Sequence, residues 1–269
     1  MHRHMRPLSC AFSAIIIWSI SGAPVAHAQS PGEIDPPHIL SITKLLVKPG
    51  KMPALIKIEA ERAHVLKRAK WPRTWIASSS VTGPKQVWIF ARYGSLGDLE
   101  KDQEYVNRTP GLRSSLDRLD QAEGELLESK REITATYQKD ISYRPRFNWS
   151  EVRYWEIIWV HLRTGHHDEY LQNRTMTREE HEKGAYDTHQ MMYAVQSGEP
   201  SGTFMVIRPM KTLSLLDDLH VHNDGEPVTP EEEARKVKLW AASGVSEEEA
   251  FFKVDSEMTY VPAHALEPN

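Results

Sequence analysis

Apolar residues follow two spacings along the chain, and the two spacings alternate in a regular order. Short runs rich in β-branched and aromatic residues predict strands, whereas apolar residues that recur every three or four positions predict amphipathic helices. In the first half, strands are predicted over residues 39–47, 74–80, 86–93 and 133–143, and helices over residues 53–69, 96–105 and 112–130.

The same order of elements returns in the second half. Strands are predicted over residues 154–162, 190–196, 203–209 and 251–260, and helices over residues 167–185, 213–222 and from 229 onward. Three pairs of matching positions have nearly the same offset: Val47 and Leu162 (115), Arg92 and Arg208 (116), and Tyr143 and Tyr260 (117). A nearly constant offset indicates an internal duplication, with one repeat at residues 37–146 and the other at residues 152–263.

Each repeat has the order βαββαβ with one helix added before the last strand, which is typical of a ferredoxin-like unit of the α+β class. Helices cover one face of such a sheet, and the other face must be buried on something else. We therefore expect the two repeats of this chain to press their uncovered faces together and form an intrachain α/β barrel.

The segment VWIFARYGSLGDLEKD at residues 87–102, in which a strand runs into a helix opened by Ser95, carries a resemblance to a known group. Together with the Pro-Gly that ends the first strand, it resembles the dimeric α/β-barrel superfamily, which includes antibiotic-biosynthesis-type monooxygenases and NIPSNAP-like domains. The resemblance covers most of both repeats and implies a small-molecule ligand and possible homo-oligomers. The chain departs from it at Asp102, where many monooxygenase-type members carry a histidine.

The first 28 residues have the composition of an export signal. Arg3 and Arg6 precede an apolar stretch over residues 10–20, and Ala26-His27-Ala28 offers small residues for cleavage before Gln29. We expect a periplasmic or secreted protein without a membrane segment after cleavage, with an uncleaved anchor as the alternative. The chain's single cysteine, at position 10, lies inside this leader, which excludes disulfides and cysteine chemistry from the mature chain.

The charge balance argues against a nucleic-acid partner. The formal net charge is −4, and a protein that binds a phosphate backbone needs clustered positive charge. Glycine-rich phosphate loops and the Gly-x-Ser-x-Gly motif are missing from the sequence, so nucleotide cofactors and α/β-hydrolase chemistry have no support.

Alternation along the strands predicts which side chains face the interior of the barrel. The candidate ligand-binding residues are Lys44, Trp88, Phe90, Arg92, Trp155, Trp159 and Phe204. Aromatic walls with a few polar groups are typical of a small-molecule pocket. The alternative is that the tryptophans simply fill the barrel.

Two further residues on the predicted interior faces are catalytic candidates. His161 is suited to act as a general base, because the pKa of a histidine lies near neutral pH. Arg208, with Arg92 at the matching position, is suited to hold a carboxylate bidentately. The alternatives are a hydrogen-bonded structural histidine and arginines paired with acids such as Asp98 and Asp217. Tyr143 and Tyr260 are expected to bond the backbone through their hydroxyls.

No metal site is predicted. His-rich segments at residues 166–169 and 220–222 lack a ligand spacing that fits a metal on a helix, and no HExxH motif is present in the sequence. The resemblance leaves haem as a possibility, because an axial histidine in the second helix of haem-degrading relatives would fall near His220 or His222. The sequence otherwise predicts no cofactor.

Three functions follow from these observations. The first is an exported barrel that binds a small aromatic or partly apolar molecule, with cofactor-independent oxygenase or isomerase chemistry as an extension. The second is a non-catalytic interaction or scaffold protein, and the third is a haem-binding protein. Whether the protein is an enzyme is left open by the sequence.

Overall fold

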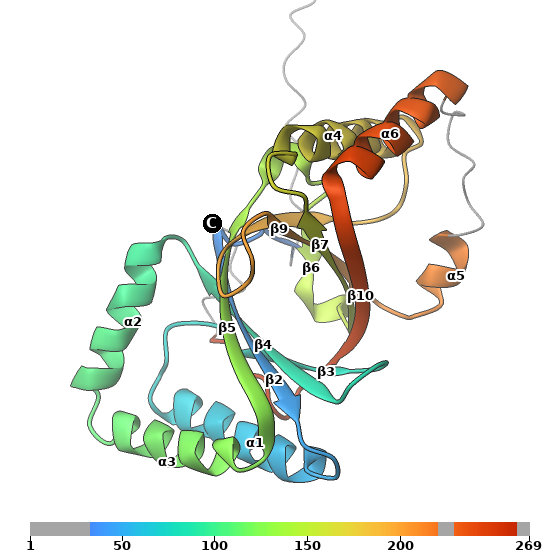
Figure 1. The fold of residues 1–269 in the computed structure, drawn as a ribbon. Helices are drawn as coiled ribbons and strands as arrows, with labels where there is room; N and C mark the ends of the chain where they lie inside the picture. The colour runs from blue at the N-terminus through green and yellow to red at the C-terminus, as the bar shows by residue number, and fades with distance from the viewer. Residues whose placement is uncertain (1–32, 220–228, 263–269) are drawn as a thin grey trace, which may run out of the picture. The chain divides into compact units, whose positions relative to one another are not determined.

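Eight strands close into one barrel in a computed structural model that describes residues 33–219 and 229–262 (Figure 1). The first repeat consists of β2 (Ile39–Val47), α1 (Met52–Arg68), β3 (Ile76–Ser80), β4 (Gln86–Tyr93), α2 (Leu96–Arg108), α3 (Leu112–Gly124) and β5 (Leu127–Tyr137). The second consists of β7 (Tyr154–Leu162), α4 (His167–Lys183), β8 (Met191–Ser197), β9 (Thr203–Met210), α5 (Leu215–Leu219), α6 (Pro230–Ser243) and β10 (Gly244–Val254).

The strand order shows how the two repeats join. Around the barrel the order is β10-β3-β4-β2-β5-β8-β9-β7, with β7 returning to β10, and every neighbouring pair is antiparallel. The last strand of each repeat therefore pairs with the second strand of the other, at β5–β8 and at β10–β3. The expected α+β fold, two ferredoxin-like units that close on each other within one chain, is confirmed.

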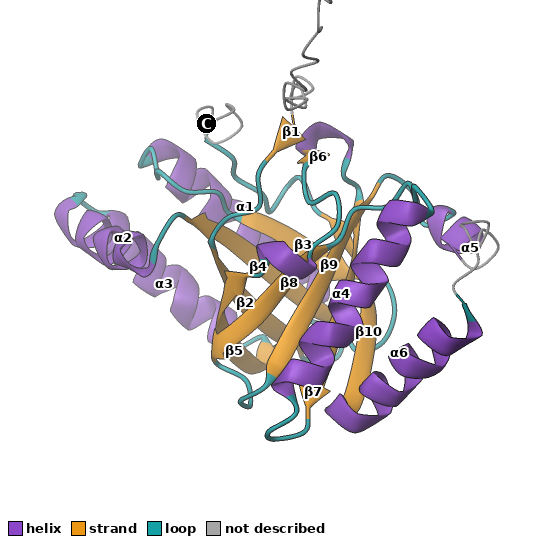
Figure 2. Cartoon of the chain, turned by 90° about the horizontal axis from the view of Figure 1, so that it is seen from above, coloured by secondary structure: helices purple, strands orange, loops and turns teal. Residues whose placement is uncertain are grey.

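Helices cover the outside of the barrel in two groups (Figure 2). In the first repeat α1 packs on α3, and in the second α4 packs on α6. The start of α6 is fixed by a capping box, in which the Thr229 hydroxyl accepts from the backbone N–H of Glu232 while the Glu232 carboxylate accepts from the backbone N–H of Thr229. None of the described helices is both long and apolar enough to cross a lipid bilayer.

The last strand of each repeat begins and ends earlier than predicted. The strand expected over residues 133–143 is β5 (Leu127–Tyr137), and the one expected over residues 251–260 is β10 (Gly244–Val254). In β5 the five residues 128–132 are charged or polar and exposed, so they lack the alternation that marks a strand. The two tyrosines expected to bond the backbone lie beyond these strands and do so: Tyr143 bonds the carbonyl oxygen of Tyr186 at 3.1 Å, and Tyr260 that of Trp71 at 3.0 Å.

Two short strands outside the barrel were not predicted. β1 (Glu33–Ile34) pairs with β6 (Phe147–Asn148), and two 3₁₀ turns, η1 (Lys139–Ile141) and η2 (Trp149–Glu151), lie in the connection between the repeats. Ile34 and Phe147 belong to the same buried cluster as the interior residues of the barrel. This small ribbon therefore covers one end of the barrel. A two-residue strand is too short to produce a detectable alternation in sequence.

Candidate functional site

The interior of the barrel is filled by aromatic and aliphatic side chains. The ring of Trp88 lies 4.4 Å from that of Phe252 and 5.7 Å from that of Trp159, and Phe90 lies 6.3 Å from Trp155, all between ring centroids. Trp88, Phe90, Trp155 and Trp159 are all buried in one cluster, as placed by alternation. Side-chain packing of this kind is the ordinary state of a small eight-stranded barrel.

An open space inside the barrel lies at one end, beneath the β1–β6 ribbon. Its volume is about 40 Å³, whereas a cavity that binds benzene measures roughly 150 Å³. Arg92 lines this space and donates to the backbone carbonyl oxygen of Asp35 at 2.6 Å. Burial lowers the pKa of Arg92. This space as it stands has room for a water-sized group and not for a substrate.

Lys44 lies toward the other end of the barrel. Its Nζ is 4.7 Å from the ring centroid of Trp88 and 4.6 Å from that of Trp159, and it forms an ion pair with Glu199 at 3.4 Å. Burial lowers the pKa of Lys44, and Glu199 opposes that shift. Because Glu199 already neutralises this ammonium group, Lys44 is placed to stabilise the tryptophans rather than to attract an anion.

His161 follows Trp159 on the interior face of β7 and is half-buried. Its Nδ1 lies 3.0 Å from the hydroxyl of Thr203, and that hydroxyl donates to the carbonyl oxygen of Pro200 at 2.7 Å. Because the hydroxyl hydrogen is used in this way, Thr203 accepts from His161, which places the imidazole proton on Nδ1. The role of His161 as a general base stays a prediction.

The predicted interior positions of Phe204 and Arg208 are wrong. Both face the helices: Phe204 packs on Tyr170 of α4 at 4.7 Å between centroids, and Arg208 pairs with Glu156 at 2.7 Å. Interior positions on β9 are taken instead by Met205 and Ile207. The error is one residue of register, which moves every side chain of a strand to the opposite face.

The observed strand pairing also shows that Arg92 and Arg208 do not occupy matching positions in the two repeats. Ser41 is paired with Ala91 across β2 and β4, and Glu156 with Arg208 across β7 and β9. The position that matches Arg208 is therefore Ala91, at an offset of 117. Neither arginine forms the ion pair weighed from the sequence, with Asp98 or Asp217; Arg92 bonds the backbone of Asp35 and Arg208 bonds Glu156.

Larger spaces lie outside the barrel wall, between the sheet and the helices. We name the space of the first repeat chamber one; it measures about 270 Å³. Its lining residues come from β2, β4 and β5, from α1 and α3, and from the loop after α1. They are Ser41, Thr43, Arg62, Leu66, Trp71, Trp75, Ile89, Ala91, Tyr93, Leu116, Asp120, Lys130 and Glu132. The corresponding space of the second repeat, chamber two, measures about 340 Å³.

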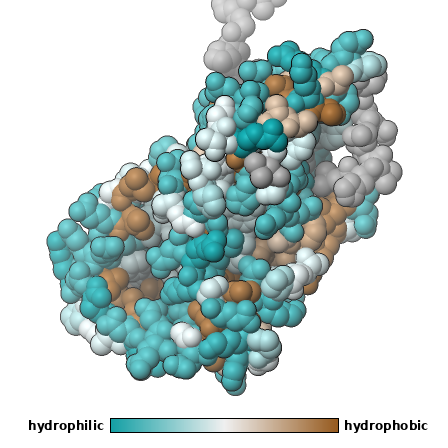
Figure 3. Space-filling view, viewed as in Figure 1, coloured by the Kyte–Doolittle hydropathy of each residue, from teal (hydrophilic) through white to brown (hydrophobic). Residues whose placement is uncertain are grey.

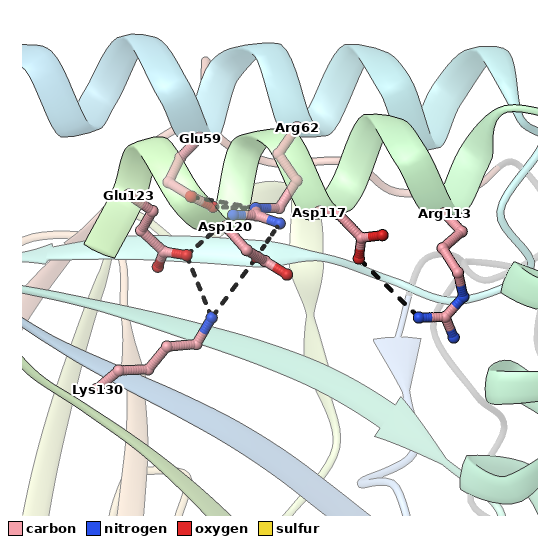
Figure 4. A network of polar contacts seen from close by, with 7 residues as sticks. All are labelled: Glu59, Arg62, Arg113, Asp117, Asp120, Glu123 and Lys130. Atoms are coloured by element: carbon pink, nitrogen blue, oxygen red, sulfur yellow. Dashed lines mark hydrogen bonds and ion pairs between the residues drawn. The ribbon is translucent and has the colours of Figure 1, made fainter. Parts of the chain in front are cut away.

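A network of charged side chains forms one side of chamber one (Figure 4). The Arg62 guanidinium donates to both carboxylate oxygens of Glu59 at 3.1 Å, to Asp120 at 2.9 Å and to Glu123 at 3.0 Å. Lys130 of β5 reaches the same Glu123 at 3.2 Å. Burial raises the pKa of Glu59, although the Arg62 charge opposes this. Three carboxylates and two cations thus hold α1, α3 and β5 together and leave one negative charge in excess.

Aromatic side chains also line chamber one, and two of them carry unused hydrogen-bond donors. The indole N–H groups of Trp71 and Trp75 are buried without a hydrogen-bond partner. Tyr93 also lines the space, and burial raises its pKa, with Asp102 adding to the shift. Asp102 lies behind Tyr93 in an ion pair with Arg73 at 3.2 Å, and burial raises the pKa of this carboxyl. Buried donors without partners are uncommon in native structures, and a ligand is one explanation for them.

Sequence reasoning missed the chamber-one residues. The segment WPRTW at residues 71–75 lies in the connection between α1 and β3; Trp71 fell outside the predicted elements, and Trp75 fell within the strand predicted over residues 74–80 and was not singled out. Two tryptophans in a short connecting loop are themselves a usable signal, because loops carry ligand-binding residues more often than core elements do.

A haem or metal site is not supported by the described residues. No group of three or more potential metal ligands lies together in residues 33–219 and 229–262. His181, the imidazole that lines chamber two, is surrounded by carboxylates and arginines, a polar setting that does not fit an apolar macrocycle. His220 and His222, on which the haem prediction depends, lie outside the described residues, as does the predicted leader.

Comparison with known proteins supports the fold. No protein-family model and no curated protein matches the sequence. Among solved structures, an anthrone oxidase-like protein matches with a TM-score of 0.57 and 14% identity, over 87% of this chain and 98% of that one. A candidate monooxygenase from Fusobacterium nucleatum subsp. nucleatum matches with 0.54 and 10%, over 80% and 91%. A second candidate monooxygenase, from Lactobacillus acidophilus NCFM, matches with 0.50 and 11%, over 83% and 96%.

These neighbours share the architecture of this chain and little of its sequence. The predicted fold is therefore confirmed: the chain forms an α/β barrel in which both ferredoxin-like units belong to one polypeptide. Identities of 14% and below carry no residue role from one protein to another, and fold alone does not define a reaction.

Proposed function

We propose that this protein binds a small, partly apolar aromatic molecule, and that its ligand site is chamber one. The observation that carries the proposal is the pair of buried, unpartnered indole N–H groups of Trp71 and Trp75 on an aromatic wall. An aromatic ring with a hydroxyl or carbonyl oxygen would stack on that wall and accept from those donors. The neighbours described as monooxygenases and as anthrone oxidase-like are consistent with a ligand of this class.

This proposal moves the ligand away from the barrel interior. Chamber one has several times the open volume of the space beneath the β1–β6 ribbon, and both charged and aromatic side chains line it. A concave, partly apolar space with a few convergent polar groups is the usual form of a small-molecule site. The seven interior and strand positions predicted to bind ligand would then act by holding the barrel in shape.

Catalysis of the oxygenase or isomerase kind, without a resident cofactor, extends the proposal. Such chemistry begins when a base removes a proton from the substrate. Tyr93 lines chamber one and Asp102 interacts with it, and burial raises the pKa of both groups. Asp102→Asn is expected to abolish turnover of a bound phenol or quinol while its dissociation constant changes little. Unchanged turnover in that variant would remove Asp102 from the reaction.

The scaffold alternative finds less support on the described surface. Large exposed apolar side chains there are Val81, Leu96, Leu215 and Val237, and each lies on a different element or turn. The face drawn in Figure 3 is mainly hydrophilic, with apolar residues in separate groups. Protein-binding surfaces usually gather their apolar residues into one patch.

Export is part of the proposal and rests on the leader sequence alone. We propose that the chain is cleaved after Ala28 and acts outside the cytoplasm. N-terminal sequencing of protein recovered from the periplasm or the medium is expected to begin at Gln29. A mature protein that retains Arg3 and Arg6 would contradict the proposal.

The binding experiment compares two tryptophans that each have a buried, unpartnered indole N–H, one in chamber one and one inside the barrel. Phenols, quinols and aromatic ketones are titrated into the parent protein, Trp71→Phe and Trp159→Phe by calorimetry. The indole N–H of Trp159 is also buried without a partner, but it lies inside the barrel. Loss of one hydrogen bond predicts roughly a five- to tenfold weaker affinity for Trp71→Phe. Equal affinity in that variant, or weakening only in Trp159→Phe, would place the ligand elsewhere.

A further inference from the structure

Chamber two differs in chemistry from chamber one, although both lie between the barrel sheet and the helices. Its lining includes four carboxylates, those of Glu156 on β7, Glu180 on α4, and Glu247 and Glu249 on β10. Arg208 of β9 is the only lysine or arginine among the described residues that line it. The lining of chamber one, by contrast, has two carboxylates and two cations. Chamber two is therefore the more acidic of the two spaces.

Two of the four carboxylates are already paired with cations. The Arg208 guanidinium donates to Oε1 of Glu156 at 2.7 Å, and the ammonium group of Lys236, on α6, donates to Glu180 at 2.5 Å. Because Arg208 is engaged in this way, it is not available to bind an anion in the chamber. The charge of the space therefore depends on the two carboxylates of β10.

Those carboxylates, Glu247 and Glu249, are exposed and form no ion pair in the part of the chain that the structure describes. Their Cα partners on β7 are Val160 and Ile158, which face the helices, so both glutamates lie on the same outer face of the sheet. Arg174 of α4 acts on Glu247 through its charge, without an ion-pair contact. The chain thus neutralises this side of the chamber only in part.

The buried carboxylate of Glu156 gives a second, independent sign of a cationic ligand. Its side chain is 4% exposed, and Oε2 is buried without a hydrogen-bond partner among the described residues. Glu249 lies next to it, and burial together with the Glu156 carboxylate raises the pKa of Glu249. A buried carboxylate oxygen without a donor is costly, so a donor that reaches this oxygen through the chamber would be stabilising.

The charged and titratable groups around Glu249 come from several elements. Those that line the chamber are Glu156 of β7, Arg208 of β9, Glu247 of β10, Glu180 and His181 of α4, and Tyr186 of the following loop. Arg174 and Lys236 lie behind them and act on His181. Burial lowers the pKa of His181 to about 4, and these cations add to the shift, so the imidazole is neutral at physiological pH. It therefore adds no positive charge that would repel a ligand cation.

We propose that chamber two binds an organic cation, a primary ammonium group carried on a short apolar chain. The ammonium group would donate to Oε2 of Glu156 and to the carboxylate of Glu249, and the proton held between these two carboxylates would leave to solvent. Ile158, Leu216 and Phe251 line the same space and would contact the apolar chain of the ligand.

The size and the polar groups of the chamber fit a ligand of this class. Its volume of about 340 Å³ accommodates a small amine. No group of three or more potential metal ligands lies together in residues 33–219 and 229–262, which favours an organic cation over a metal ion. The assignment does not depend on the aromatic-ligand site in chamber one.

The test uses ligands that share a five-carbon chain and differ in charge. Pentylamine, 1-pentanol and pentanoate are titrated by calorimetry into the mature protein at about pH 8, where an amine of this kind is protonated. Pentylamine is expected to bind roughly ten- to a hundredfold more tightly than the other two, the usual effect of a charged hydrogen bond. Equal affinity for 1-pentanol or pentanoate, or absence of amine binding, would overturn the proposal.

Amine affinity should also depend on pH, because the ligand competes with the proton between Glu156 and Glu249. Affinity is expected to rise with pH through the folded pKa of Glu249, by at most about tenfold per pH unit, and to stay constant above it. Glu249→Gln is expected to bind pentylamine at least about tenfold more weakly at about pH 8 and to lose this pH dependence.

Glu248→Gln is the matched control, because it makes the same substitution at the next residue of the same strand. Glu248 is exposed, and its Cα partner Trp159 faces the barrel interior, so its side chain lies on the other face of the sheet from Glu249. This variant should keep both the affinity and its pH dependence. Pentylamine affinity that survives Glu249→Gln, or that falls equally in Glu248→Gln, would overturn the assignment.

The outcome is separate from that of the aromatic-ligand proposal. Neither Glu248 nor Glu249 lines chamber one, and the five-carbon ligands have no aromatic ring to stack there. Failure of amine binding therefore leaves the proposal for chamber one standing, and failure of phenol binding leaves this one standing.

Discussion

Glu156 and Glu249 lie diagonally across β7 and β10 on the outer face of the sheet, with Arg208 on the far side of Glu156. Only one oxygen of Glu156 bonds Arg208, and its second oxygen is buried without a donor among the described residues. A protonated Glu249 would supply that donor. This arrangement, together with burial, explains why the pKa of Glu249 is raised.

Replacing Glu249 by glutamine should therefore change how stability depends on pH. The folded pKa of Glu249 lies above its ordinary value of 4.5, so the fold binds this proton more tightly than the unfolded chain does. The resulting stabilisation is complete below about pH 4.5 and is lost as the pH rises through the folded pKa. Glu249→Gln is expected to raise the melting temperature at about pH 8 and to leave it unchanged at about pH 4.

Thermal unfolding followed by circular dichroism across this range measures the effect. Glu128→Gln, on the exposed part of β5, is the control and should show no such pH dependence. A Glu249→Gln variant that is less stable than the parent at about pH 8 would contradict the shared-proton arrangement.

Alternation in the sequence was enough to assign most interior residues to the correct face of their strand. It failed on a strand that has apolar residues on both faces. On β7 a run of nine strand residues ends at Thr164-Gly165, so Trp155 and Trp159 were placed correctly inside the barrel. On β9 the residues of both faces are apolar, with Phe204 and Val206 outside and Met205 and Ile207 inside. Such a strand has no alternation to read, which is why Phe204 and Arg208 were placed on the wrong face.

Strand β8 joins the two repeats by pairing with β5, and its end is shaped by Gly198. This glycine has φ +88°, and a Cβ added there would lie 2.0 Å from the carbonyl oxygen of Glu132 on β5. The pairing register of β5 with β8 shifts close to this point, between Thr134 and Ala135. Only a residue without a side chain allows the backbones of the two repeats to approach this closely.

Gly198→Ala is expected to destabilise the protein far more than Gly83→Ala. Gly83 also has a positive φ, +71°, but an added Cβ would meet nothing within 4 Å. The change at Gly83 should cost about 1 kcal/mol for the strained backbone alone, whereas the change at Gly198 adds a backbone clash and should cost about 3 kcal/mol or more. Urea unfolding of the two variants measures both, and equal losses would show that the β5–β8 join tolerates a side chain.

Elements were easier to predict from the sequence than their ends. Most helices and barrel strands fall where periodicity placed them, because each buries one face and leaves the other in water. β5 and β10 were displaced because residues near their starts are exposed and carry polar side chains. The chambers could not be predicted, because they depend on the distance between sheet and helices and on loop residues such as Trp71.

At the scale of the whole molecule, the duplication of one unit explains the fold. Sequence differences between the two repeats explain why the two chambers have different linings. The interior cluster combines side chains of both repeats, with Trp88 on Trp159 and on Phe252. Each sheet would expose this aromatic face to water if it stood alone. Closing the barrel within one chain leaves each outer chamber free to change separately, since no symmetry requires the two to stay alike.

Separating the repeats should therefore destroy the fold of each half and preserve that of the pair. Residues 29–148 and 149–269 are produced as two chains, alone and together. Together they should form a one-to-one complex that unfolds in a single transition, because each half supplies a strand partner for the other. Each half alone is expected to aggregate or to pair with itself, as measured by light scattering after gel filtration. Halves that fold as stable monomers would contradict intrachain closure.

The most direct measurement concerns where a ligand enters. The protein is labelled with ¹⁵N in tryptophan, the indole N–H signals are assigned with single Trp→Phe variants, and a phenol that binds is titrated in. The signals of Trp71 and Trp75, in chamber one, are expected to move on binding, while those of Trp88, Trp155 and Trp159, inside the barrel, stay in place. Movement of the three interior signals with Trp71 and Trp75 unchanged would contradict this expectation and return the ligand to the barrel interior.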